Sequence, residues 1–157
     1  MGSLARLGEA DAEPTAMRAT LCDLAQRPEQ YIGKLVEVPA SVSGNDLSID
    51  DFEQKPACPS WMGVILVLPE QMKPKPDFDV VRDDPFNQFF ADLRKGMNMQ
   101  ATFEGRFEAV YTWRNQKQVW IGEGGANRKG FGKRGQYGGR ILLRRVSDLL
   151  ARPVPRR

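Results

Sequence analysis

Residues 97–111 of the chain, MNMQATFEGRFEAVY, alternate between apolar or small side chains and polar ones. The apolar face carries Met99, Ala101, Phe103, Gly105, Phe107, Ala109 and Tyr111, and the polar face carries Thr102, Glu104, Arg106 and Glu108. Because successive side chains of a strand point to opposite faces, this period of two predicts one long strand with a single buried face. Gly105 lies within the apolar face, where a missing side chain allows a bend of the kind that closed barrels use.

The residues just before this strand are expected to form a helix over residues 85–95, PFNQFFADLRK. Its apolar side chains recur at i, i+3, i+4 and i+7, on one helix face that we expect to be core: Phe86, Phe89, Phe90 and Leu93. Asp84 is expected to cap the first turn, Pro85 fits the first helical position, and Gly96 ends the helix.

Three shorter strands are predicted upstream of this helix. They are residues 34–42 (KLVEVPASV), a short strand lined by Leu47, Ile49 and Phe52, and residues 63–68 (GVILVL), the best candidate for a buried central strand. Pro39, within the first of them, indicates a sheet edge or a bulge, because proline cannot donate to a strand ladder.

The remaining segments complete the predicted order. A short helix is expected over residues 20–25, and a proline- and acid-rich surface loop over residues 69–85. Residues 140–146, RILLRRV, are expected to form a last strand, followed by a short helical turn over residues 147–151.

Three strands, a helix and two further strands follow one another in the order of the OB-fold, a five-stranded partly open barrel. We therefore expect an all-β fold with minor α-helix, in one OB-like barrel domain over residues 18–151 that starts with the short N-terminal helix. Residues 1–17 are expected to form a mobile leader that lacks the apolar stretch of a signal peptide, and residues 152–157 a basic C-terminal tail.

Two stretches also resemble a family. Residues 21–44, LCDLAQRPEQYIGKLVEVPASVSG, with Cys58-Pro59 ahead of an apolar strand, are similar to small OB-like bacterial proteins of unassigned function, and so is the ending GQYGGRILLRRVSDL over residues 135–149. The resemblance covers about residues 20–150 and implies an OB-like fold but no mechanism. Many members of that group carry export signals, so the resemblance favours a periplasmic or exported protein over a cytoplasmic one. This chain departs from the family by adding a basic, glycine-rich stretch before the shared ending.

The chain contains no histidine. This absence excludes Ser-His-Asp and Cys-His catalysis and every zinc site that needs imidazole. No coherent pair of nucleophile and base is evident among the other residues. We therefore expect a non-enzymatic binding module without a cofactor or metal.

The positive charge of the chain is concentrated near its end. Residues 114–145 hold nine basic side chains and one acidic one, a net charge of +8, so that the remainder carries −5 of the overall +3. Basic and aromatic residues interleave here, and this basic aromatic segment, residues 113–140, contains the candidate ligand-binding residues Trp113, Arg114, Lys117, Arg128, Lys129, Phe131, Lys133, Arg134, Tyr137 and Arg140. Lysine and arginine neutralise phosphates, and aromatic rings stack on unpaired bases.

The segment is open to two interpretations. It contacts an anionic macromolecule, which is single-stranded nucleic acid for a cytoplasmic protein and an acidic protein surface or envelope polymer for an exported one. Alternatively it is a solvated hairpin loop whose aromatic rings pack back on the barrel. Trp120, between Val119 and Ile121, is expected to be core rather than ligand-binding.

Residues 130–135, GFGKRG, match G-x-G-x-x-G, but the dinucleotide-binding form of this motif needs a strand before it and a helix after it. A strand is predicted after it here, so we do not expect a dinucleotide site. Two carboxylate clusters, Asp46, Asp50, Asp51 and Glu53, and Asp77, Asp79, Asp83 and Asp84, lack calcium-loop spacing and are expected to be solvated turns.

Cys22 and Cys58 have neither a C-x-x-C partner nor a neighbouring histidine. Taken alone they are either a disulfide or two buried free thiols. The family resemblance, with its frequent export, favours the disulfide. The alternative function that follows is an exported protein–protein interaction or inhibitor module stabilised by a Cys22–Cys58 bond.

Overall fold

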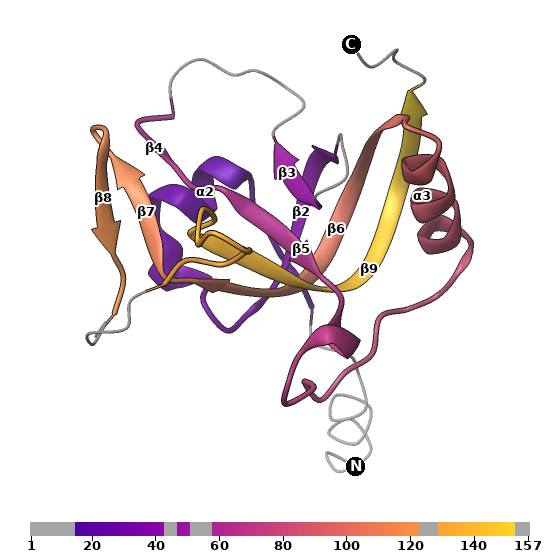
Figure 1. Cartoon of the computed structure of the whole chain (residues 1–157), viewed down its shortest axis with the longest axis horizontal. Coiled ribbons are helices and arrows are strands. Elements are labelled where there is room, and N and C mark those ends of the chain that lie inside the picture. The colour runs from indigo at the N-terminus through magenta and orange to yellow at the C-terminus, as the bar shows by residue number, and fades with distance from the viewer. Residues whose placement is uncertain (1–14, 43–46, 51–57, 123–128, 153–157) are drawn as a thin grey trace, which may run out of the picture.

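The computed structural model describes residues 15–42, 47–50, 58–122 and 129–152, which form a mostly β fold with two α-helices (Figure 1). The strands are β1 (Met17–Arg18), β2 (Leu35–Val42), β3 (Ser48–Asp50), β4 (Ser60–Trp61), β5 (Val64–Val67), β6 (Asn98–Ala109), β7 (Tyr111–Arg114), β8 (Lys117–Trp120) and β9 (Gly139–Arg152). The helices are α2 (Leu21–Gln26) and α3 (Asp84–Arg94), with the 3-10 turns η1 (Pro28–Gln30) and η2 (Pro69–Gln71). None of the described helices has the length and apolar character needed to cross a membrane.

Five strands pair in a closed circuit. β2 pairs antiparallel with β3 and with β6, β3 pairs antiparallel with β5, β5 pairs parallel with β9, and β9 pairs antiparallel with β6. β1 adds a short parallel strand to β2. These six strands thus form one mixed sheet whose last strand, β6, pairs back with β2, and β4, β7 and β8 form a second, three-stranded sheet.

The prediction for residues 97–111 is confirmed over β6. Met99, Phe103 and Phe107 are fully buried, and the alternation continues to Tyr111, the first residue of β7. β6 pairs on one edge with β2 and on the other with β9, and its register with β9 shifts between Glu104 and Gly105. A Cβ on Gly105 would lie 2.1 Å from the Leu142 carbonyl oxygen, so only glycine allows β9 to approach β6 at this bend.

The predicted helix before β6 is confirmed as α3, with one correction at its start. The N-cap is Asp83, whose carboxylate accepts a hydrogen bond from the Phe86 backbone N–H at 3.2 Å, and Asp84 is the first helical residue. Both aspartates suit a helix start, and the cap lies two residues before Pro85, so that proline takes the second helical position. Phe89 meets Phe103 edge-to-face at 5.4 Å, which seats the helix on the barrel core.

The N-terminal helix is also confirmed. Thr20 caps α2 through a reciprocal capping box with Asp23, and the buried side of the helix carries Leu21, Leu24 and Ala25. Pro39 lies near the middle of β2. On one edge of β2 it is paired with Thr102 of β6, and on the other edge it falls between the residues that pair with β1 and those that pair with β3, so no described residue is its partner there. The missing N–H of proline is tolerated there for that reason.

One further expectation is wrong, and a second needs an addition. The predicted helical turn over residues 147–151 is strand, because β9 continues to Arg152 through a bulge at Asp148, whose φ is +50°. The bulge disrupts the period of two that marks a strand, so the alternation is lost over these residues. The loop after η2 is not a simple surface loop: Val80 is buried and the Val81 N–H donates to the Arg144 carbonyl oxygen at 2.7 Å.

We predict that Gly105→Ala destabilises the protein by about 3 kcal/mol or more, because the added methyl group meets backbone that cannot move without breaking the β6–β9 ladder. Gly63→Ala is the matched control, since its Cβ would meet the Tyr137 ring at 3.1 Å, a side chain that can shift. Urea unfolding followed by circular dichroism measures both. Equal stabilities of the two variants would contradict the close approach described for Gly105.

Candidate functional site

A second, smaller sheet carries part of the basic aromatic segment. β4, β7 and β8 form this three-stranded sheet, with Trp61 paired to Trp113 and Arg114 paired to Lys117. Asn115 and Gln116 make the β7–β8 turn with φ values of +51° and +64°. A two-residue turn with both φ values positive matches the twist of a hairpin. This hairpin is not evident from the residues, because glutamine is uncommon at the second position of such a turn.

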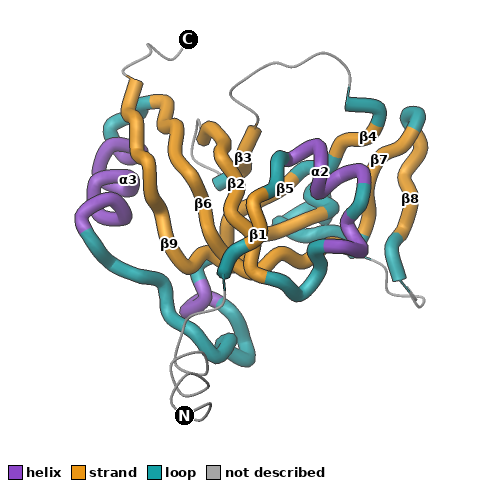
Figure 2. Tube along the Cα trace, turned by 180° about the vertical axis from the view of Figure 1, so that it is seen from behind, coloured by secondary structure: helices purple, strands orange, loops and turns teal. Residues whose placement is uncertain are grey.

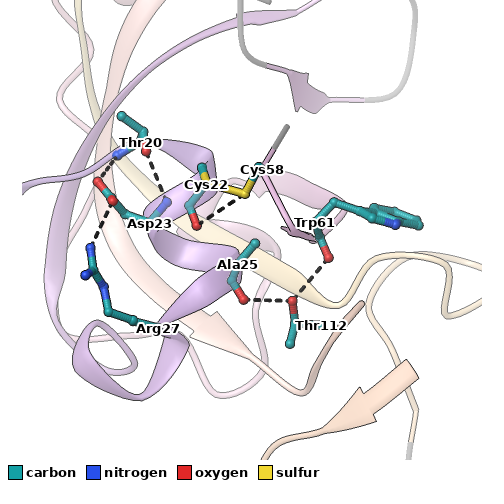
Figure 3. The surroundings of a disulfide bond; sticks show 8 residues. All are labelled: Thr20, Cys22, Asp23, Ala25, Arg27, Cys58, Trp61 and Thr112. Carbon is teal, nitrogen blue, oxygen red and sulfur yellow. Dashed lines mark hydrogen bonds and ion pairs between the residues drawn. A yellow bond between two sulfur atoms is a disulfide. The ribbon is translucent and has the colours of Figure 1, made fainter. Parts of the chain in front are cut away.

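Buried polar contacts fix this sheet to α2 (Figure 3). The fully buried Thr112 hydroxyl lies 2.9 Å from the Ala25 carbonyl oxygen and 3.1 Å from that of Trp61, and donates its single proton between them. The Arg114 guanidinium donates to the Gln26 carbonyl oxygen at 3.1 Å, at the C-terminal end of the same helix. Arg114, a predicted ligand-binding residue, is therefore occupied in joining β7 to α2.

A disulfide makes a second connection between α2 and β4. Cys22 and Cys58 are bonded, with their Cα atoms 5.8 Å apart (Figure 3). Of the two possibilities that the residues alone left open, the structure contains the disulfide. It ties the first turn of α2 to the residues that lead into β4, and so helps to place Trp61.

Trp61 and Trp113 form a stacked pair on this sheet. Their ring centroids are 5.4 Å apart and their planes differ by 7°. The side of the pair that faces solvent is largely Trp61, which is 56% exposed, the highest value among the large apolar side chains described. The sequence analysis did not select Trp61, because β4 is two residues long and shows no periodicity. Its position three residues after Cys58 was the only available signal.

The glycine-rich stretch folds around the side chain of Tyr111. The Tyr111 hydroxyl donates to the Gly135 carbonyl oxygen at 2.8 Å, and its ring meets Trp120 edge-on at 5.1 Å. A Cβ on Gly130 would lie 2.7 Å from the Tyr111 ring, and one on Gly138 would lie 2.0 Å from the Tyr111 carbonyl oxygen. These glycines allow the backbone to pack against one buried tyrosine. The burial also raises the pKa of the Tyr111 hydroxyl above its ordinary value.

Phe131 and Tyr137 close this stretch into a narrow loop. The Phe131 N–H donates to the Tyr137 carbonyl oxygen at 2.6 Å, and the reverse bond measures 3.2 Å. Between them, Gly132 and Gly135 adopt positive φ values of +83° and +64°. β9 follows the loop directly, so G-x-G-x-x-G leads here into a strand, as the sequence analysis expected.

The predicted cations divide into two groups. Arg140 is engaged: it makes an ion pair with Glu108 at 2.5 Å, and its guanidinium lies over the Phe131 ring at 4.4 Å. Arg114 is engaged with α2, as described above. The exposed group, which we call the basic rim, consists of Lys117, Lys129, Lys133 and Arg134. Arg128 lies outside the described residues.

The acidic clusters do not form a metal site in the described part of the chain. No group of three or more potential ligands is found there. Asp77 pairs with Arg106, Asp79 pairs with Lys75, and Asp83 caps α3. Three members of the other cluster, Asp46, Asp51 and Glu53, lie outside the described residues.

In comparisons with known proteins, no family model, no curated protein and no solved structure matches the chain. What the site can do follows from its own geometry. That geometry is a stacked tryptophan pair in which Trp61 is exposed, and a rim of exposed cations, on backbone to which Tyr111, Thr112 and the disulfide make contacts.

We predict that Tyr111→Phe lowers the free energy of unfolding by about 1 kcal/mol at neutral pH, because the Gly135 carbonyl oxygen loses its donor. The raised pKa of Tyr111 means that the folded state prefers the neutral phenol. The neutral phenol therefore contributes to the free energy of unfolding in full at pH values below the unfolded pKa near 10. This contribution is lost as the pH rises through the pKa of the folded state. Urea titrations at pH 8 and pH 11 should therefore show the variant and the wild type converging at high pH. A constant difference would contradict this role.

We predict that Cys22→Ser/Cys58→Ser lowers the free energy of unfolding by about 3–4 kcal/mol, because the bond constrains the unfolded chain across a separation of 36 residues. Reducing the wild type should produce a similar loss, whereas the reductant should not affect the double variant. Tryptophan fluorescence should also change, since β4 carries Trp61. Equal stability of the oxidised and reduced wild type would contradict the prediction.

Proposed function

We propose that the chain is a non-enzymatic binding module built on an OB-fold, and that the basic rim and the Trp61–Trp113 pair contact an anionic partner. The closed circuit of five strands, which are β2, β3, β5, β6 and β9 in chain order, supports the fold assignment, and so does the position of α3 between β5 and β6. The connection between β6 and β9, the fourth and fifth of these strands along the chain, consists of residues 110–138 and contains the β7–β8 hairpin and the glycine loop. In OB-folds that connection borders the binding face.

The observation that carries the proposal is that the cations of the basic aromatic segment fall into two groups, one engaged within the protein and one exposed to solvent. Arg114 and Arg140 bind groups within the protein, and recruiting either to a ligand would break an existing contact. The basic rim residues are solvent-exposed, and no ion pair with another described residue engages them. They can neutralise an anionic chain at no such cost. Trp61, exposed on the same three-stranded sheet as Lys117, offers an apolar surface for the uncharged part of that chain.

The disulfide favours one class of anionic partner. Disulfides persist in oxidising compartments, where an acidic protein surface or envelope polymer is a more available partner than single-stranded nucleic acid. We therefore propose an acidic polymer or protein surface as the partner, in an exported or periplasmic setting. Nucleic acid remains the competing outcome, since tryptophan rings with flanking lysines also suit unpaired bases.

We predict that Lys133→Ala/Arg134→Ala weakens binding to polyglutamate at least tenfold at low salt and reduces the salt dependence of the affinity. Arg94→Ala/Lys95→Ala is the matched control, because it removes the same charge from exposed residues at the end of α3, at the opposite end of the molecule (Figure 1). Fluorescence anisotropy with labelled polyglutamate and with a single-stranded oligonucleotide measures both variants.

Three results of that experiment have distinct meanings. Tighter binding of the oligonucleotide, with a slope of log affinity against log salt near −0.7 for each phosphate contacted, would replace the acidic polymer by nucleic acid. Equal weakening of polyglutamate binding in the two variants would show that the affinity depends on the net charge of the protein and not on the basic rim. No binding of either probe at low salt would overturn the proposal.

A second candidate function is supported by the disulfide and by the exposure of Trp61. Tryptophan is enriched at the energetic centres of protein interfaces, so an exported protein–protein interaction or inhibitor module would also present such a residue. Thiol quantification on protein taken from its native cell separates export from residence in the cytoplasm. Two free thiols there would contradict both the second candidate and the preference for an acidic polymer.

A further inference from the structure

A groove separate from the basic rim opens beside β1. It has a volume of about 600 Å³ and is lined by Thr15, Met17, Gly33, Lys34, Leu35, Asp77, Phe78, Arg106 and Arg144. These residues come from β1, from the turn before β2, from the loop after η2 and from the outer faces of β6 and β9 (Figure 2). Small-molecule sites have volumes of roughly 300–1,000 Å³, so the groove has the size of such a site.

The groove walls are apolar over a substantial part. Met17 is 39% exposed on β1, one of three large apolar side chains described as exposed. Leu35 begins β2, and Phe78 lies on the loop that packs against β6. Apolar side chains left partly open to solvent around a concave surface favour a ligand with an apolar body.

Arg106 supplies a cation whose hydrogen-bond donors are largely uncommitted. Its side chain is 32% exposed and its guanidinium lies 5.5 Å from the centre of the Phe78 ring. Among the described residues, the nearest carboxylate oxygens belong to Asp77 at 3.6 Å and Glu108 at 3.9 Å, both beyond the length of a good hydrogen bond. The Asp77 side chain is 91% exposed, and Glu108 is bound more closely by Arg140, at 2.5 Å.

The other charges at the groove differ from Arg106. Arg144 lies 2.6 Å from Glu104 and is largely buried, so that its charge is balanced within the protein. Lys34 is exposed and adds a positive charge to the groove wall. Among the described lining residues Asp77 is the one carboxylate, against the cations Lys34, Arg106 and Arg144, so this part of the groove is electrostatically suited to a small anion.

We propose that this groove binds a small amphipathic carboxylate. The head group accepts two N–H···O bonds from Arg106, displacing the long contact with Asp77, and the apolar body lies against Phe78, Met17 and Leu35. Lys34 adds attraction for the anion. The site is independent of the proposed polymer-binding surface, since none of its residues belongs to the basic rim or to the tryptophan pair.

The test uses decanoate as the probe and the full chain as the protein. In ¹⁵N-edited NMR spectra, decanoate should shift the amide resonances of Gly33, Leu35 and Phe78. Decanol, which has the same apolar chain without the charge, and butyrate, which has the charge with a short chain, should each bind at least tenfold more weakly. Arg106→Leu should weaken decanoate binding at least tenfold.

Arg82→Leu is the matched control. Arg82 also lies over a phenylalanine ring, Phe86 at 5.1 Å, and pairs with a carboxylate, Glu70, but it does not line the groove. Its replacement removes the same charge from the same type of contact, and decanoate affinity should remain within twofold of the wild type. Should Arg106→Leu fail to fold, Phe78→Ala serves instead and should weaken binding several-fold.

Several outcomes would overturn the proposal. Equal binding of decanol and decanoate would show an apolar site without head-group recognition. Shifts confined to residues 113–120 and 129–138 would place the anion on the basic rim. Absence of any shift at millimolar decanoate, or equal weakening by Arg106→Leu and Arg82→Leu, would remove the site altogether.

Discussion

The close approach of Gly105 to the Leu142 backbone constrains the large sheet at the strand that two of its ladders share. β6 pairs along one edge with β2 and along the other with β9, and Gly105 is a partner residue in both ladders, opposite Val36 and opposite Leu143. A strand shared in this way must bend for the sheet to return to its own first strand. Any side chain at this point would force β9 away and separate the two ladders.

Tyr111 imposes a similar close-packing constraint on the residues that follow β6, because Gly130 and Gly138 lie tightly against it. It continues the buried face of β6 into β7, and its ring and hydroxyl organise both the hairpin aromatics and the glycine loop. The glycines near it provide close packing, and their number is not in itself a sign of flexibility or of phosphate binding. The backbone near the basic rim is therefore packed against Tyr111. An ordered backbone lowers the loss of conformational entropy when a ligand binds.

The distribution of charge is less polarised in space than it is along the chain. Residues 114–145 carry a net charge of +8 in sequence, yet Arg140 and Arg144 are paired with Glu108 and Glu104 of β6. These pairs lie on the outer face of the β6–β9 ladder, where carboxylates from one strand meet guanidinium groups from the other. What is left for a partner is the smaller set of cations on the basic rim, and the loosely paired Arg106 at the groove.

The elements with a local pattern could be predicted from the amino-acid residues alone. β6, α3, α2, β2 and β5 each follow from a periodicity, a cap or an apolar run within a dozen residues, and Gly105 was identified as a bend from its place in one such pattern. The helical turn expected at residues 147–151 was wrong because a bulge at Asp148 breaks the period of two there. The engagement of particular cations, the stacking of Trp61 on Trp113 and the groove beside Arg106 follow from the three-dimensional arrangement alone. Each depends on contacts between segments far apart in the chain, such as Arg140 and Glu108, 32 residues apart, and Arg114 and Gln26, 88 residues apart, and no short-range pattern encodes which surfaces the fold brings together.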